Sequence, residues 1–218
     1  MNKHFLFTAS LICLLSSFAF SQTRTAQPVK PAPKNAEVKA SLDEIPQEQW
    51  NRLAAALRAE NWQNAASTAM EYLLKLKTEN EKKQVAQLNY IYLFALAGRT
   101  AQGGMPFEEL EKMAQSFVGR EFLMVSRQIL ADCEARLNYI CAQKGSSRIL
   151  RTTSTNRAGD AIHFFEYVKL KEPFDVPSNA EKIAFVGGTL SKVETVERKG
   201  IKALRLIFDN GYVRVTTD

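Results

Sequence analysis

The sequence is poor in the residues from which most catalytic and metal sites are built. It has three cysteines and two histidines among 218 residues. A Gly-rich phosphate loop, a paired-histidine metal motif and a nucleophile-elbow motif are all missing. With so few sulfur and imidazole ligands, we expect no metal site and no cofactor. These absences favour a non-enzymatic protein over an enzyme.

The N-terminus carries an apolar run that is too short to span a membrane comfortably. Lys3 and His4 precede this run, and Ala19-Phe20-Ser21 forms a small–x–small site after it. This layout is typical of a secretory signal peptide, with cleavage expected after Ser21. We therefore predict a periplasmic or secreted protein with no transmembrane segment after cleavage. An uncleaved N-terminal anchor is the alternative.

Residues 22–42 are expected to form a disordered tether. They contain Pro28, Pro31 and Pro33 among Lys, Thr, Gln and Ala, and they show no apolar periodicity. Such a segment buries too little surface to offset its chain entropy.

The stretch from Trp50 to Leu76 predicts two short helices folded back on each other. Its apolar residues recur in steps of three and four, which places them on one stripe of each helix. Glu60-Asn61 interrupts the pattern, and Asn61 is expected to cap the second helix with its side-chain oxygen.

This stretch resembles a tetratricopeptide repeat over one repeat length. The residues at the spacings of that family are Trp50, Leu53, Ala54, Leu57 and Ala66. Thr78 stands where the family has its terminal proline, and a generic antiparallel helix pair is the alternative. The resemblance implies a concave surface that binds a protein partner.

A second helical hairpin is expected to complete a helical domain over residues 43–120. One helix is predicted over 80–97 with Gly98 as its C-terminal stop. After a loop, Pro106 is expected in the first turn of another helix, which Gly119 ends.

Residues 121–218 predict an antiparallel β domain. Strands are expected at 122–125, 139–142, 149–155, 161–171, 183–186, 190–197, 201–208 and 212–216, although 125–137 is also compatible with helix. Lys199-Gly200 and Asn210-Gly211 predict hairpin turns, and Gly187-Gly188 predicts a bulge or sharp bend. Strand number and size resemble an oligonucleotide/oligosaccharide-binding (OB) barrel, and an unrelated small barrel is equally compatible. The predicted fold class is α+β, with tetratricopeptide-like helical hairpins followed by a small antiparallel β-barrel.

Cys133 and Cys141 are the two cysteines that remain after the expected cleavage. An even number of cysteines in an exported chain predicts one disulfide between them. Two buried reduced thiols, or a nucleophile paired with His163, are the alternatives.

One strand face mixes aromatic and cationic side chains. The ligand-binding candidates are His163, Phe165, Tyr167, Lys169, Lys171, Arg205, Tyr212 and Arg214. Such a face can stack on sugars or bases and attract an anionic oligosaccharide or nucleic acid, as the net charge of +6 also favours. The alternative is that the aromatic residues pack against the helices and the cations are solvated. Our first hypothesis is an interaction or scaffold protein of the cell envelope with a protein partner, because the repeat resemblance implies a concave surface and no catalytic set is found. The second hypothesis is a binder of anionic oligomers through this strand face.

Overall fold

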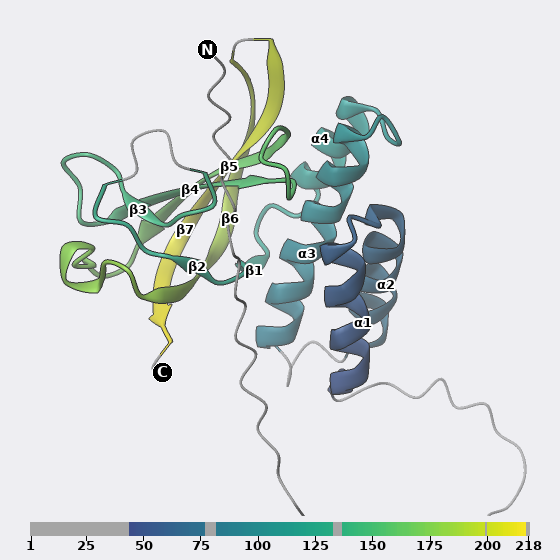
Figure 1. Ribbon diagram of the computed structural model, residues 1–218, viewed down its shortest axis with the longest axis horizontal. Coiled ribbons are helices and arrows are strands. Elements are labelled where there is room, and N and C mark those ends of the chain that lie inside the picture. The colour runs from purple at the N-terminus through teal and green to yellow at the C-terminus, as the bar shows by residue number, and fades with distance from the viewer. Residues whose placement is uncertain (1–43, 77–81, 133–136, 199, 217–218) are drawn as a thin grey trace, which may run out of the picture. The chain divides into compact units, whose positions relative to one another are not determined.

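Helices precede strands along the chain, as Figure 1 shows. The computed structural model describes residues 44–76, 82–132, 137–198 and 200–216, all of which belong to one compact unit. The predicted α+β class is confirmed. The expected signal peptide and tether lie outside the described residues. None of the helices in the described parts of the chain is long and apolar enough to cross a membrane.

Four helices lie on one side of a sheet (Figure 1). They are α1 (Gln47–Arg58), α2 (Trp62–Lys75), α3 (Lys82–Ala101) and α4 (Phe107–Gln115). α3 contacts strands β1 and β5, α2 packs on α3, and α1 packs on α2. The predicted cap is confirmed, since the Asn61 side-chain oxygen accepts a hydrogen bond from the Asn64 backbone N–H at 3.2 Å.

Gly98 does not end α3, which continues to Ala101. A glycine stops a helix when it takes a positive φ, and Gly98 is not among the glycines that do so. Its role is packing. A Cβ atom at this position would lie 2.3 Å from Cδ2 of Trp62. Gly98 therefore lets the Trp62 indole of α2 lie directly on the α3 backbone.

The segment after α4 leads the chain into the sheet. Pro106 is the N-cap residue of α4, one position before the helix begins. The prediction that Gly119 ends this helix is wrong, because α4 ends at Gln115 with Ser116 as its C-cap. Gly119 lies beyond the helix, has a φ of +90° and donates its backbone N–H to the Leu190 carbonyl. The positive φ is accessible to glycine at little cost, so it turns the chain from α4 into the first strand.

The strands form one mixed sheet. They are β1 (Glu121–Leu123), β2 (Arg127–Gln128), β3 (Cys141–Ala142), β4 (Ile149–Thr155), β5 (Ile162–Leu170), β6 (Ile183–Arg198) and β7 (Ile201–Val215). Their order is β1-β6-β7-β5-β4-β3, with β2 also on β6. The β5–β7 pair is parallel and the others are antiparallel. Within the described residues the sheet is not closed, so the predicted barrel is not confirmed.

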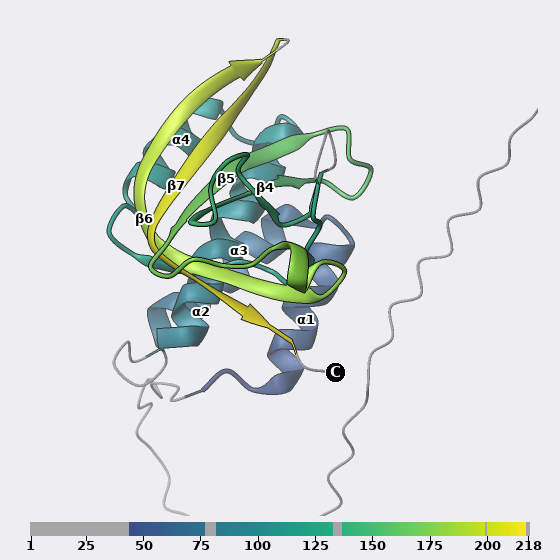
Figure 2. The ribbon, with the colours of Figure 1, turned by 90° about the vertical axis from the view of Figure 1, so that its left-hand side faces the viewer.

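The Asn210-Gly211 hairpin turn is a wrong prediction, because β7 runs through these residues without reversing. Asn210 has the expected positive φ of 55°, but it lies in a bulge where the pairing with β6 shifts between Gly187 and Thr189. A positive φ serves a bulge as well as a tight turn. Figure 2 shows the bend of β6 and β7, and the bulge predicted at Gly187-Gly188 is confirmed.

A row of aromatic rings joins the helices to the sheet. Tyr92 of α3 stacks on Phe117 at 5.7 Å between centroids, Phe117 meets Phe122 of β1 at 6.1 Å, and Phe122 meets Phe208 of β7 at 5.5 Å. All four side chains are buried. Helices and strands therefore share one hydrophobic core.

Candidate functional site

The predicted ligand-binding residues do not share one surface. His163 lies in the core, and Tyr212 and Arg214 line a pocket. Phe165, Tyr167, Lys169 and Arg205 lie on the sheet face that points away from α3, and Lys171 is exposed just after β5.

His163 is the clearest departure from the expected strand face. Pairing between β4 and β5 shifts after Ser154, so Phe164 and Ile162 are both paired while His163 lies between them. Its ring is 2% exposed and lies 4.9 Å from the Phe94 ring and 5.4 Å from the Trp62 ring. Burial lowers the pKa of His163 to about 4, so the imidazole is neutral at neutral pH.

Among the described residues, the same geometry gives no support to a cysteine–histidine nucleophile. Both ring nitrogens of His163 lack a hydrogen-bond partner among the described residues. A nucleophile pair requires such a bond between the base and the thiol. Cys141 is buried on β3 in a small cluster with Leu130 and Tyr139.

The Cys133–Cys141 disulfide stays a prediction, because Cys133 lies outside the described residues. We expect the intact protein purified without reductant to be lighter by two hydrogens than the reduced protein. We also expect a protease digest to contain one peptide pair that links the two cysteines. Alkylation of both cysteines in unfolded, unreduced protein would contradict the prediction. If the disulfide is present, its reduction is expected to lower the free energy of unfolding by about 2–3 kcal/mol.

The outer sheet face combines aromatic residues with charges that are largely paired. The Arg205 guanidinium lies 5.4 Å from the centroid of the Tyr167 ring and 3.1 Å from Glu194. Lys169 pairs with Asp209 at 3.2 Å. Glu194 and Asp209 come from β6 and β7, so their place on this face depends on strand pairing. Their charges offset the cations, which weakens the attraction of this face for a polyanion.

A buried polar network, which sequence reasoning missed, joins α3 to the sheet. The Tyr90 hydroxyl donates to Glu166 at 2.9 Å and contacts Ser154 at 2.6 Å. Arg127 donates to the Tyr90 hydroxyl at 2.7 Å and to Thr152 at 2.5 Å. Arg127 and Glu166 form an ion pair at 3.5 Å, and Ser154 also binds both of them.

The side chains of this network are enclosed by the fold, so we assign the network a structural role. Ser154 and Glu166 are fully buried, and Arg127 is 7% exposed. Burial raises the pKa of the Tyr90 phenol, so it stays protonated. Burial alone would lower the pKa of Arg127, but Tyr90 and Glu166 outweigh it and raise that pKa. The only sign of this network in the sequence was Glu166, an acid that lies on the same strand face as the inward residues Phe164 and Val168.

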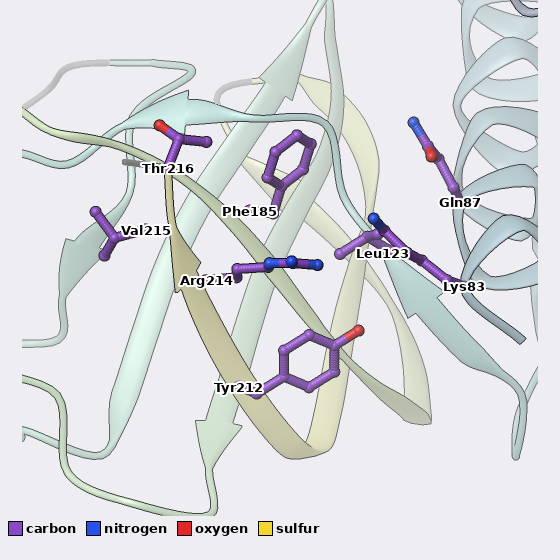
Figure 3. Close-up of a pocket in the computed structure, with 8 residues that line it drawn as sticks. All are labelled: Lys83, Gln87, Leu123, Phe185, Tyr212, Arg214, Val215 and Thr216. Atoms are coloured by element: carbon purple, nitrogen blue, oxygen red, sulfur yellow. The ribbon is translucent and has the colours of Figure 1, made fainter. Parts of the chain in front are cut away.

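A pocket of about 400 Å³ lies between the N-terminal part of α3 and the sheet, and we call it the Arg214 pocket. α3 contributes two side chains one helical turn apart, and β1, β6, the end of β7 and the residue that follows β7 contribute the others. Its lining residues are Lys83, Gln87, Leu123, Phe185, Tyr212, Arg214, Val215 and Thr216 (Figure 3).

Strand register sets the positions of the pocket side chains. Phe185 of β6 is the cross-strand partner of Arg214, and Gly187 is the partner of Tyr212. A Cβ on Gly187 would lie 2.4 Å from Cζ of Tyr212, so the phenol ring occupies the space above that glycine. In Figure 3, Arg214 extends from β7 toward α3, with the rings of Phe185 and Tyr212 on either side of it.

The Arg214 pocket is electropositive. Lys83 and Arg214 form no ion pair with any residue that the structure describes, and the lining contains no Asp or Glu. Burial and the nearby Glu121 raise the pKa of Tyr212, so its hydroxyl remains a donor at neutral pH. Gln87 and Thr216 add polar groups. This combination suits an anionic group attached to an apolar or aromatic part.

The described residues contain no cluster of three or more His, Cys, Asp or Glu side chains that could hold a metal ion. No protein-family model, curated protein or solved structure matches this chain. The resemblances to tetratricopeptide and OB folds therefore remain predictions.

Proposed function

We propose that the protein is a non-catalytic binding protein whose ligand places an anionic group in the Arg214 pocket. The observation that carries this proposal is the pair of cations, Lys83 and Arg214, that face one pocket without a carboxylate partner among the described residues. A ligand anion would supply the missing partner, with charge-assisted hydrogen bonds from the guanidinium.

The apolar residues of the pocket indicate which kind of molecule carries the anionic group. Phe185 and Tyr212 flank Arg214, and Leu123 lies on the neighbouring strand β1. Aromatic rings contact sugar or aromatic faces well, so we favour a carboxylate, phosphate or sulfate on a ring-containing ligand. The end of an acidic oligosaccharide satisfies this description.

A long polyanion along the outer sheet face is the weaker alternative. There Glu194 and Asp209 already pair with Arg205 and Lys169. The signal-like segment over residues 1–21 supports action in the periplasm or outside the cell, which remains part of the proposal.

Binding of benzoate, an aromatic carboxylate, tests the site. In ¹⁵N–¹H spectra of the protein without residues 1–21, we expect benzoate to shift the amides of residues 212–216 and of Phe185. Arg214→Gln is expected to weaken binding about tenfold or more, because a charge-assisted hydrogen bond contributes about 1.5–3 kcal/mol. Lys83→Gln should weaken benzoate binding less than Arg214→Gln does. The lysine ammonium acts as a point charge, whereas the planar arginine guanidinium can donate two parallel hydrogen bonds to one carboxylate.

Arg151→Gln is the matched control, since Arg151 is an exposed arginine on β4, outside the pocket. It should leave benzoate affinity unchanged, and neutral benzyl alcohol should shift these amides far less than benzoate. Equal affinity of Arg214→Gln and wild-type protein, or shifts that map elsewhere, would contradict the proposal.

A further inference from the structure

An apolar groove of about 720 Å³ lies among α2, α3, α4 and the start of β1. Its apolar lining includes Met70, Leu73, Leu74, Val85, Met113 and Phe117. Methionine side chains are flexible and polarisable, so surfaces that contain them adapt to apolar partners. We call this surface the α2–α4 groove.

Leu74 shows that the described residues leave this groove uncovered. It is 80% exposed, whereas the next most exposed large hydrophobic side chain among the described residues, Tyr212, is 45% exposed. A single exposed apolar residue needs no explanation, but Leu74 continues into the apolar lining of the groove. The exposed leucine and the hollow beside it therefore form one contiguous apolar surface.

The border of the groove is positively charged. Lys82 and Arg120 line it and make no ion pair with the described residues, while Glu121 is the one acid in the lining. The Arg120 guanidinium lies 4.4 Å from the centroid of the Phe117 ring. A partner with apolar side chains flanked by Asp or Glu would match both the lining and the border.

Charge also argues against the chain itself as the occupant. The whole chain has a net charge of +6, so two copies of it repel each other on average, which disfavours a second copy as the occupant. Residues 22–42 contain four cations, Arg24, Lys30, Lys34 and Lys39, against the single acid Glu37. These charges favour a different protein with an acidic docking segment as the occupant.

The hydrogen bonding at the edge of β1 favours a helical partner segment over a partner strand that would extend the sheet. The Asn89 side chain donates to the Glu121 carbonyl at 2.9 Å, so this edge acceptor is already bound. A strand that paired with β1 at this point would have to displace Asn89, whereas a helix needs only side-chain contacts.

We propose that the α2–α4 groove binds an acidic amphipathic helix of a partner protein, with apolar residues spaced three and four apart against Leu74 and its neighbours. Acidic side chains beside that stripe pair with Lys82 and Arg120. This site is separate from the Arg214 pocket and does not depend on it.

The probe is a fluorescein-labelled peptide of about four helical turns, with Leu on one stripe and Glu beside it. Two further probes are a scrambled peptide of the same composition and a version with Lys in place of Glu. Fluorescence anisotropy with the chain from residue 22 onward should show saturable binding of the Leu/Glu helix that weakens with added salt. The other two peptides should bind at least about tenfold more weakly.

Leu74→Ser should reduce this affinity about tenfold, and its high exposure means that folding is not at risk. Ile183→Ser, at an exposed apolar position on β6, is the matched control and should bind as wild type does. Arg120→Glu should shift preference toward the Lys peptide. Equal binding of the three peptides, or unchanged affinity in Leu74→Ser, would overturn the proposal.

Discussion

Replacing Glu166 by Gln is expected to lower the free energy of unfolding by about 3–5 kcal/mol, because it leaves the Arg127 guanidinium buried without a counter-charge. The carboxylate accepts hydrogen bonds from Tyr90 and Ser154 and lies 3.5 Å from Arg127, with its side chain fully buried. Urea unfolding at neutral pH measures the change, which should appear as a lower midpoint with an unchanged slope.

A matched control is Glu194→Gln on the outer face, which removes the ion pairs with Arg205 and Lys192. Because Glu194 is partly exposed, this change should cost about 1 kcal/mol or less. The double variant Arg127→Met/Glu166→Leu should recover much of the loss, since it removes the unpaired charge. A Glu166→Gln protein as stable as Glu194→Gln would contradict the structural role of the network.

Acid is expected to destabilise the protein through His163 by about 3 kcal/mol as pH falls from about 6.5 to about 4. Burial lowers the pKa of His163 from 6.5 to about 4 in the folded state. Between these values the unfolded chain binds a proton that the folded chain does not, so stability rises with pH across this window and is lost as pH falls. No hydrogen-bond partner compensates the imidazole among the described residues.

Urea midpoints from pH 7 to pH 4 test this prediction in the chain from residue 22 onward, where His163 is the only histidine. Carboxylates also titrate in this range, so the informative quantity is the difference between wild type and His163→Phe. The phenyl ring keeps an aromatic contact with Trp62 and Phe94, and the stability of this variant should vary less with pH by about 3 kcal/mol. Parallel curves for the two proteins, or an imidazole titration near pH 6.5 by NMR, would refute the role of His163.

Elements that depend on local pattern were predictable from the sequence. The helical stripes of α1 and α2 and the Asn61 cap lie where the spacing of apolar residues placed them, and β4 has the expected bounds Ile149–Thr155. Gly98 and Asn210 were misread, because the same residue types serve two purposes. Glycine either ends a helix or admits a close neighbour, and Asn at positive φ forms either a turn or a bulge.

The candidate sites were less predictable, because they depend on pairing between distant segments. An irregular register beside His163 reverses the side expected from simple alternation, and the bulge at Asn210 lets β7 continue toward the Arg214 pocket. Tyr212 and Arg214 were recognised as candidates, but their neighbours Lys83 and Phe185 were not, because α3 and β6 meet β7 only in the folded chain. Nor does the sequence indicate that Glu194 and Asp209 neutralise the outer face.

The aromatic row from Tyr92 to Phe208 has a consequence for how such a chain can be inherited. A recombination event near residue 120 would place Phe117 and Phe122 in different products. Each product would then expose apolar side chains that are buried in the intact chain. Exchange of the helices alone, or of the sheet alone, would therefore require new apolar residues that fit the part retained.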